Sequence, residues 1–418
     1  MSVQKNVVIV DAYSPTRRLA PEFHRAGYQV VRVQSTPEPP SAYRTNFDLS
    51  PYAANIIHTG DLDATVRAVA AHAPEAVIAG GEIGVELADQ LSEALGLVTN
   101  GTALSAARRD KYIQIETIRA AGLRATRQLL VTGPEQLADW HRELGGRIVV
   151  KPIRSGAGDG VSFCDTPEQA IAGYEAIVAA DNVFSIRNEG VIAQEYLVGG
   201  EYIVDTVSRD GQHHVTDIWK YEKLTANGIT DLTCGIRLLP RHGEAQDQVV
   251  PYALDVLDAL GIAHGASHLE IKLTPDGPCL VEAAARMAGL DIPFYSQHAI
   301  GEAQLEWMVD AYVRPERFAA RWKDDYQLRQ HFVTAMQVST VDAGLGSYPL
   351  LADVERLESL LDVRPLVAPG GRLRRTVDDL TCPMIVNLSH PVEEIVVRDF
   401  GTLRYLDGPG FYALAGES

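Results

Sequence analysis

Two glutamates, Glu270 and Glu282, are the residues of this 418-residue chain whose spacing most directly suggests chemistry. They stand in two apolar runs on either side of Pro275-Asp276-Gly277, which predicts a hairpin with this triplet in the turn. In that register Glu270 lies opposite Glu282, and Lys272 lies opposite Leu280. Opposed Cβ atoms are about 4.5–5.5 Å apart, a separation at which two like charges destabilise the pairing. The pattern predicts a divalent cation between the carboxylates; the alternative is a solvated hairpin face.

The same hairpin face carries further polar side chains. Because side chains alternate along a strand, we expect one face to hold His268, Glu270, Lys272, Glu282 and Ala284. Arg286 follows two residues later on the same alternation. His268 either touches a substrate carboxylate or deprotonates an amine, since imidazole titrates near neutrality, or it orients a metal ligand. Both interpretations of His268 stay open at this point.

A glycine-rich loop, Ser155-Gly156-Ala157-Gly158-Asp159-Gly160, follows the strand expected at 147–151. Glycines let successive backbone N–H groups turn toward an anion at little steric cost. The loop leads into another expected strand at 161–164, whereas the dinucleotide fingerprint and the Walker loop both lead into a helix. We therefore expect a flexible flap over phosphates, with a structural turn as the alternative.

Composition narrows the class of protein. The formal net charge of −18 disfavours nucleic acid as a partner. The four cysteines are scattered without C-x-x-C pairs, which suits reduced thiols in a cytoplasmic protein. The N-terminal residues lack a signal-peptide pattern, and there is no run of about twenty apolar residues to span a membrane.

Strands and helices are expected to alternate over the first hundred residues, which indicates an open, parallel α/β sheet. Ligands bind at the carboxyl ends of such strands, where Gly80-Gly81-Glu82 stands, so Glu82 is a candidate partner for a substrate ammonium. The alternative is a tight turn with an acid at a helix N-terminus. Residues 219–236 are interpreted as a long functional loop, from which Lys220 and Lys223 reach phosphates or a carboxylate or remain solvated. His213-His214 is placed in a hairpin turn, and neither it nor the chain after 301 is assigned any chemistry.

Several motifs stand in a fixed order along residues 1–300: Lys111, Val150-Lys151-Pro152, the glycine loop, Gln194-Glu195-Tyr196-Leu197 with Glu201, His268-x-Glu270, and Glu282-x-x-x-Arg286. In this order and approximate spacing the chain resembles the ATP-grasp superfamily, and within it the carboxylate–amine ligases of the L-amino-acid (dipeptide) ligase type. The resemblance implies an ATP-grasp fold in four parts. These are an N-terminal α/β substrate domain (1–107), a small α+β subdomain with the glycine flap (108–195), a large subdomain with the metal hairpin (196–301) and a C-terminal extension (302–418).

The resemblance also implies roles for single residues. Lys111, Lys151 and the loop residues Ser155, Gly156, Gly158 and Gly160 would hold the nucleotide phosphates. Glu195, Tyr196 and Leu197 would form the adenine hinge, and Glu201 would hold the ribose. Glu270 and Glu282 would bind Mg²⁺, and Arg286 would stabilise the phosphorylated intermediate. Many members carry an asparagine two residues after the second acid, but Ala284 stands here, which removes one expected metal ligand.

The expected function is an ADP-forming ligase that uses ATP and Mg²⁺ to join an amino acid or other small carboxylate to an amine through an acyl phosphate. The alternatives are a biotin-carboxylase-like or purine-pathway enzyme, or a non-catalytic ATP-binding regulator. A nicotinamide oxidoreductase is disfavoured, because the dinucleotide fingerprint is absent. The expected partners are small amino acids or carboxylates, and a homodimer is the expected assembly.

Overall fold

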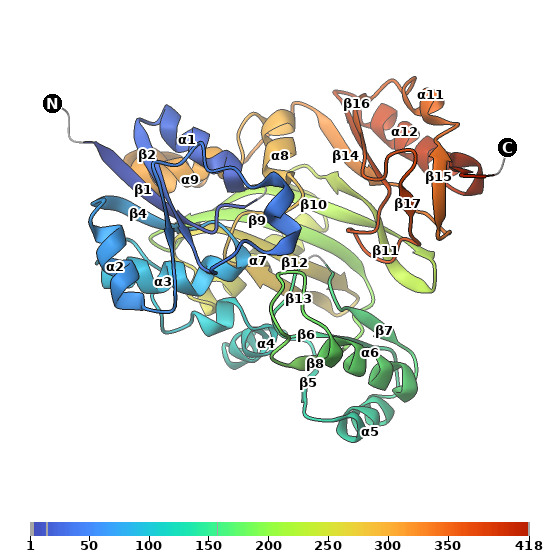
Figure 1. Ribbon diagram of the computed structural model, residues 1–418, viewed down its shortest axis with the longest axis horizontal. Coiled ribbons are helices and arrows are strands. Elements are labelled where there is room, and N and C mark those ends of the chain that lie inside the picture. The colour runs from blue at the N-terminus through green and yellow to red at the C-terminus, as the bar shows by residue number, and fades with distance from the viewer. Residues whose placement is uncertain (1–3, 14–15, 157, 417–418) are drawn as a thin grey trace.

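The first hundred residues form a parallel four-stranded sheet in the order β3-β2-β1-β4, as the alternation predicted (Figure 1). The computed structural model describes residues 4–13, 16–156 and 158–416. The strands are β1 (Lys5–Val10), β2 (Tyr28–Gln34), β3 (Ala54–Ile57) and β4 (Pro74–Ala79). The helices are α1 (Leu19–Arg25), α2 (Leu62–Ala70) and α3 (Val85–Ala94), with short 3₁₀ turns η1 (Thr16–Arg18), η2 (Ser41–Asn46) and η3 (Glu82–Gly84). Strand β3 was not predicted, because it is a short edge strand whose side chains stay partly exposed.

A second, antiparallel sheet in the order β5-β8-β6-β7 carries two helices on one side. Its strands are β5 (Gln128–Val131), β6 (Ile148–Pro152), β7 (Ser162–Cys164) and β8 (Val191–Glu195). Its helices are α5 (Pro134–Leu144) and α6 (Pro167–Ala179). Before it come η4 (Ala106–Arg108) and α4 (Lys111–Ala120), whose N-cap Asp110 accepts hydrogen bonds from the backbone N–H of Tyr112 and Ile113. This cap fixes Lys111 as the first residue of α4.

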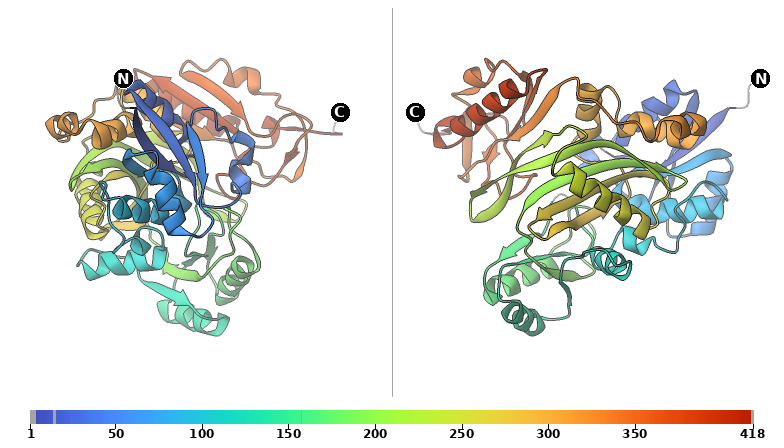
Figure 2. Two further views of the ribbon diagram at one scale, coloured as in Figure 1. Left: turned by 60° about the vertical axis from the view of Figure 1, so that its left-hand side comes forward. Right: turned by 180° about the vertical axis from the view of Figure 1, so that it is seen from behind.

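An eight-stranded sheet in the order β13-β12-β9-β10-β11-β14-β18-β16 forms the centre of the molecule. Its members from the middle of the chain are β9 (Gly200–Arg209), β10 (Gln212–Ala226), β11 (Ile229–Leu238), β12 (Gly265–Thr274) and β13 (Gly277–Ala284). Helix α7 (Gln246–Ala259) packs on one face of this sheet, where Leu269 and Ile271 are fully buried (Figure 2). The opposite face is free to line a cavity.

The interpretation of 219–236 as a loop was wrong. These residues belong to β10 and β11, which turn at Asn227-Gly228, both with positive φ. An Asn-Gly pair between two strands is a strong hairpin signal that was available in the sequence. The strands are polar because Tyr221 and Lys223 face the cavity rather than a core.

The last part of the chain does not begin a separate sheet at residue 302. Strands β14 (His331–Met336), β16 (Leu360–Pro365) and β18 (Met384–His390) extend the central sheet beyond β11. A small sheet joins β15 (Ala343–Ser347), β17 (Arg372–Leu373) and β19 (Ala413–Leu414). The helices are α8 (Ile292–Ile300), α9 (Gln304–Val313), α10 (Pro315–Arg321), α11 (Leu351–Val354) and α12 (Glu393–Leu406), with η5 (Pro409–Phe411) near the end. Across the described ranges, no helix has the length and apolar character needed to cross a membrane.

The hairpin formed by β12 and β13 has the predicted pairing of Glu270 with Glu282. Its turn is one residue shorter than predicted, because Gly277 already pairs with Thr274 as the first residue of β13. Below this pair the register shifts by one residue, so Lys272 lies opposite Cys279 and not opposite Leu280. The prediction for Lys272 was wrong because the turn holds two residues and not three. A β-bulge then inserts one extra residue into β13 and restores the predicted register at Glu282, which no local pattern signals. The bulge lies directly beside the two acids.

His213 and His214 lie within β10, and the turn predicted to contain them is formed by Asp210 and Gly211 alone. His214 stacks on Trp307 with 3.5 Å between ring centroids, and it hydrogen-bonds the carbonyl of Trp322. Burial lowers the pKa of His214 to about 4. The histidine pair therefore serves the packing of β10.

We expect His214 to make the fold sensitive to acid. As pH falls from about 6.5 toward 4, the unfolded chain binds a proton that the folded chain excludes, so stability falls. His214→Phe keeps the stacking and should reduce the loss of unfolding free energy between pH 7 and pH 4.5 by about 2–3 kcal/mol. Urea denaturation at the two pH values measures this. The exposed His24→Gln is the control, and an equal acid sensitivity of wild type and His214→Phe would contradict the assignment.

Candidate active site

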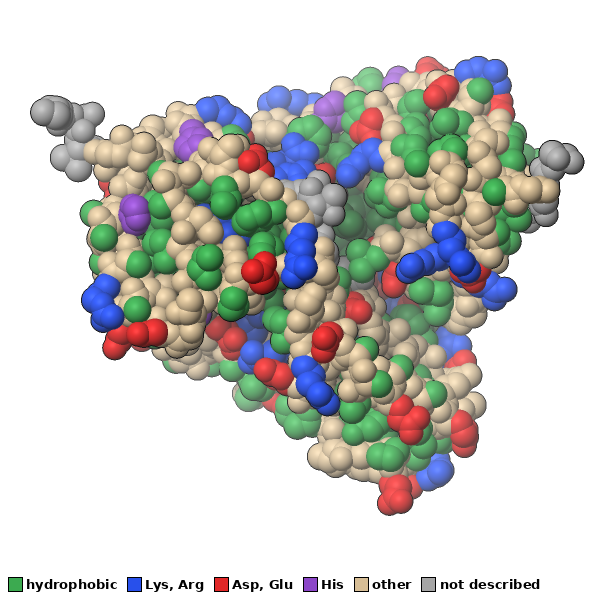
Figure 3. Space-filling view, in the orientation of Figure 1, with side chains coloured by type: hydrophobic (Ala, Val, Ile, Leu, Met, Phe, Trp, Pro, Cys, Tyr) green, Lys and Arg blue, Asp and Glu red, His purple; other side chains and the backbone are tan. Residues whose placement is uncertain are grey.

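A cavity of about 800 Å³ opens where the N-terminal sheet, the small antiparallel sheet and the C-terminal part meet. The space-filling view shows the surface hollowed at this place (Figure 3). Cavities of this size hold ligands as large as a nucleotide with a small co-substrate. The cavity is lined by both hairpin glutamates, the glycine loop, the 194–197 segment and, from the end of the chain, 377–380.

Glu270 lies on the cavity wall and is held by its neighbours. The Tyr221 hydroxyl donates to its Oε1 at 2.8 Å, and His268 Nε2 lies 3.5 Å from the same oxygen. Burial opposes the charge of Glu270, but His268, Tyr221 and Lys223 outweigh it and lower its pKa to about 2. Glu270 is therefore a carboxylate at neutral pH.

His268 is engaged at both ring nitrogens. Nδ1 lies 2.7 Å from Oδ1 of the buried Asp205, and Nε2 faces Glu270. Burial disfavours the imidazolium, but the two carboxylates raise the pKa of His268 to about 10. Because neither nitrogen is directed at open space, the geometry favours the interpretation in which His268 orients Glu270. Asp205 was missed at the sequence level, because its contact with His268 depends on the pairing of β12 with β9.

Glu282 lies opposite Glu270 and pairs with Lys111, whose Nζ is 2.9 Å from its Oε1. The same ammonium donates to the carbonyl of Ser155 at 2.9 Å, so Lys111 connects the hairpin to the glycine loop. Lys151 is buried nearby and donates to the carbonyl of Val281 at 3.4 Å. Burial and the neighbouring Lys111 lower the pKa of Lys151 to about 8.

The glycine loop forms one edge of the cavity. Ser155, Gly156 and Gly158 line the cavity, whereas Gly160 does not. Ala157 lies outside the described residues. Gly158 and Gly160 have φ values of 74° and 72°, and a Cβ at Gly160 would lie 2.9 Å from Pro152 Cγ. The turn is stabilised by Asp159, which accepts hydrogen bonds from Ser155 Oγ and from the backbone N–H of Val183. The loop therefore needs glycine at its last position for conformational and steric reasons.

The segment Glu195-Tyr196-Leu197 lines the opposite end of the cavity. The side chain of Glu195 turns away to Arg127, at 2.7 Å, and the backbone N–H groups of Glu195 and Tyr196 donate to the carbonyls of Arg127 and Arg147. The Tyr196 hydroxyl donates to Asp231, and the Lys272 ammonium lies over the Tyr196 ring. Glu201 faces Lys223 at 3.4 Å and Lys272 at 3.7 Å.

Glu82 and Arg286 meet at the end of the cavity nearest the N-terminal sheet. Arg286 Nε lies 2.7 Å from Glu82 Oε2, and Arg109 pairs with the other oxygen of Glu82. The two arginines overcome the effect of burial and lower the pKa of Glu82 to about 2. Both oxygens of Glu82 are thus engaged, so the structure lends no support to Glu82 as the partner of a substrate ammonium.

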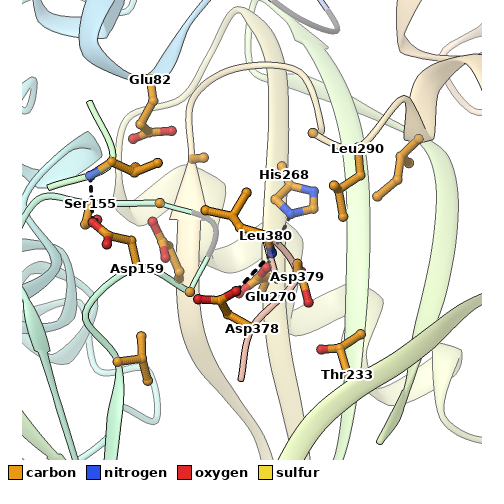
Figure 4. A pocket seen from close by; sticks show the side chains of 18 of the residues that line it. Glu82, Ser155, Asp159, Thr233, His268, Glu270, Leu290, Asp378, Asp379 and Leu380 are labelled. Atoms are coloured by element: carbon orange, nitrogen blue, oxygen red, sulfur yellow. Dashed lines mark hydrogen bonds and ion pairs between the residues drawn. The ribbon is translucent and has the colours of Figure 1, made fainter. Parts of the chain in front are cut away.

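Lys220 does not line the cavity, which corrects its assignment as a candidate substrate contact. Its neighbours Tyr221 and Lys223 line it instead. Side chains alternate along a strand, so only the register of β10 in the sheet decides which lysine faces the ligand. Asp378 and Asp379 also line the cavity, although the end of the chain had been assigned no chemistry (Figure 4).

The residues on the hairpin suit a hard cation. Glu270 and Glu282 present two carboxylates from paired positions of one cavity wall, and carboxylate oxygens are the ligands that Mg²⁺ prefers. In the described ranges no set of three or more His, Cys, Asp or Glu side chains is arranged to hold a metal. Ala284 lines the cavity where a further ligand was expected.

Comparison with known proteins agrees with this geometry. Residues 145–293 match the model of the ATP-grasp domain. The chain is 30% identical over 398 residues to dapdiamide A synthase of Enterobacter agglomerans, covering 92% of each chain. It is 26% identical to alanine–anticapsin ligase of Bacillus subtilis, over about half of each protein. Among solved structures, the L-amino acid ligase from Bacillus licheniformis superposes with a TM-score of 0.75 at 17% identity, over 97% of this chain and 98% of that one.

The fold, the ordered site and the extended similarity place this chain in the ATP-grasp family. It is an ATP-grasp carboxylate–amine ligase, as the resemblance predicted.

Proposed function

We propose that this ligase joins the carboxylate of one amino acid, or of another small acid, to the amine of a second amino acid. ATP is consumed and ADP and phosphate are released. The observation that carries the proposal is that one cavity combines paired carboxylates, two buried lysines, a glycine loop and a partly buried arginine. The similarity to dapdiamide A synthase and alanine–anticapsin ligase, named for the products and substrates they act on, supports substrates of this class.

In this proposal the nucleotide lies between the glycine loop and the 195–197 segment. Backbone groups of Glu195, Tyr196 and Leu197 other than the N–H groups of Glu195 and Tyr196, which already donate to carbonyls, hold the adenine. Glu201 accepts hydrogen bonds from the ribose. Lys111 and Lys151 compensate the phosphate charges, while Ser155, Gly156 and Gly158 offer backbone N–H groups from above. Burial and the neighbouring ammonium of Lys111 lower the pKa of Lys151 to about 8, and the negative charge of a phosphate would raise it.

The hairpin acids would hold Mg²⁺, with Glu270 fixed by His268 and Tyr221, and with Glu282 beside Lys111. When bound, the metal compensates the negative charge of the phosphate oxygens. Asp205 and His268 act on Glu270 through hydrogen bonding, so they are positioning residues.

Arg286 would act on the substrate carboxylate and its phosphorylated form. The attacking carboxylate oxygen forms a bond to the terminal phosphorus, and ADP leaves with the electron pair of the broken P–O bond. The amine, after its ammonium form has lost a proton to solvent, then attacks the acyl carbon. The bond from that carbon to the phosphate oxygen breaks with its electron pair on phosphate, and the second proton of the nitrogen also passes to solvent. Arg286 donates to oxygens that gain charge in both steps, and its planar guanidinium suits paired oxygens. Glu82 keeps the guanidinium oriented through its 2.7 Å contact.

The alternative functions have weaker support. An N5-carboxyaminoimidazole ribonucleotide synthetase superposes with a TM-score of 0.67 at 18% identity, which reflects the shared fold. The sequence similarity to dapdiamide A synthase is more extensive. A regulator that only binds ATP would not need Arg286 and Glu82 at the far end of the cavity from the 195–197 segment.

We keep the division of the chain into four parts at residues 107, 195 and 301 as a proposal about which part binds which ligand. The parts before and after residue 301 share the eight-stranded sheet. The expected homodimer remains a prediction that light scattering coupled to size exclusion tests.

Phosphate release from ATP across pairs of amino acids and related small acids is the direct test of the function. We expect release that needs both a carboxylate and an amine, with ADP as the nucleotide product and the amide found by mass spectrometry. AMP as the product would exclude an acyl phosphate. ATP binding without release for any pair would favour the regulator.

A further inference from the structure

The acids that line the cavity differ in whether they have partners. Most form ion pairs: Glu82, Glu195, Glu201, Asp231, Glu270, Glu282 and Asp291. Others accept hydrogen bonds within their own or a neighbouring loop: Asp48, Asp159 and Asp378. Among the residues that the structure describes, Asp379 has neither an ion pair nor a hydrogen bond to its carboxylate. The carboxylate of Asp379 can therefore pair with a cationic group that enters the cavity.

The backbone around Asp379 is firmly held. Asp378 Oδ1 accepts from the backbone N–H of Thr381 at 2.9 Å and from the Thr381 hydroxyl at 2.8 Å. Asn227, at the tip of the β10–β11 hairpin, donates to the carbonyl of Thr376 at 2.8 Å. The turn between β17 and β18 is thus fixed on both sides, and Asp379 lies beside Glu270 in the cavity (Figure 4).

The surroundings of Asp379 are partly apolar and partly acidic. Val377 and Leu380 line the cavity and are 44% and 55% exposed. Burial raises the pKa of Asp379 to about 6, with Glu270 and Glu201 adding to the effect and Lys223 opposing it. Exposed apolar side chains next to an open carboxylate suit an organic ammonium. Mg²⁺ instead prefers oxygen ligands on all sides and retains water.

We propose that Asp379 binds the ammonium group of the amine substrate, while Val377 and Leu380 contact the side chain of that substrate. This rests on the proposed ligase function and names the residues that select its second substrate. Asp379 thus takes the ammonium-binding role that the sequence suggested for Glu82, because both oxygens of Glu82 are paired with arginines. The C-terminal extension then completes the active site instead of only covering it.

Asp379→Asn tests the proposal with L-valine, L-leucine and glycine as amines, each paired with the carboxylate that releases most phosphate in the assay above. The KM for these amines should rise about ten- to a hundred-fold, since a hydrogen bond to a charged group is lost. The KM values for ATP and the carboxylate should change less than about twofold. Hydroxylamine, uncharged at neutral pH, attacks the acyl carbon and releases phosphate, so hydroxamate formation should be unaffected.

Two further variants complete the design. Asp353→Asn removes a partly exposed acid of α11 that pairs with Arg356 outside the cavity, and it should change none of these constants. Leu380→Ala leaves the charge in place and should raise the KM for leucine about fivefold more than that for glycine. This variant still tests the site if Asp379→Asn fails to fold.

The outcomes separate this proposal from the one on which it rests. Unchanged amine KM values in Asp379→Asn and Leu380→Ala would overturn the amine site. A loss of hydroxamate formation that excess Mg²⁺ restores would make Asp379 a metal ligand and would also overturn it. If wild type forms no hydroxamate with any carboxylate, the proposed function itself fails.

Discussion

Arg286→Ala is expected to lower kcat about 10²–10³-fold while the Kd of ATP changes less than about threefold. The arginine lies at the Glu82 end of the cavity, away from the 195–197 segment, so its loss removes charge compensation from the reacting oxygens and not from the nucleotide. The fold should survive, because Glu82 keeps its pairing with Arg109. Steady-state kinetics and calorimetric ATP titration measure the two effects.

Two variants sharpen this result. Arg286→Lys keeps the positive charge but loses the planar pair of donors, so its kcat should lie between those of wild type and the alanine variant. Arg67→Ala, an exposed arginine on α2, should behave as wild type. A collapse of ATP affinity with an unchanged kcat would instead make Arg286 a nucleotide-binding residue.

Glu282→Gln is expected to abolish turnover at any Mg²⁺ concentration, with a decrease in kcat/KM of at least about 10³-fold. The amide keeps the shape of the side chain but removes one of the two opposed negative charges that would hold the metal. It also frees Lys111, which pairs with Glu282 at 2.9 Å. Initial rates across a Mg²⁺ titration measure the effect, and thermal denaturation checks that the fold is retained.

The exposed Glu394→Gln on α12 is the charge-matched control and should leave the Mg²⁺ dependence unchanged. If Glu282→Gln had the same rates and the same Mg²⁺ dependence as wild type, Glu282 would be removed from the metal site. Full activity at raised Mg²⁺ would mean that Glu270 and another oxygen hold the metal.

Much of the site follows from neighbours in the sequence. The hairpin and the side-chain alternation of its strands are local properties. The two-residue turn alone would place Val281 opposite Glu270, however, and the bulge in β13 brings Glu282 to that position. The backbone turns at Gly158 and Gly160 also follow from the local sequence, because glycine adopts positive φ values readily. The parallel N-terminal sheet follows from buried strands that alternate with helices.

Other features depend on contacts between distant parts of the chain. Glu82 and Arg286 meet across 204 residues, and His268 meets Asp205 only because β12 pairs with β9. The register of β10 in the sheet decides that Lys223 rather than Lys220 faces the cavity. Asp379 enters the cavity because the turn between β17 and β18 is anchored to the β10–β11 hairpin. Residue types and local spacing thus determined which chemistry this protein carries. The tertiary structure decided which charges are already paired and which carboxylate is left open for a substrate, because pairing depends on side chains that only folding brings together.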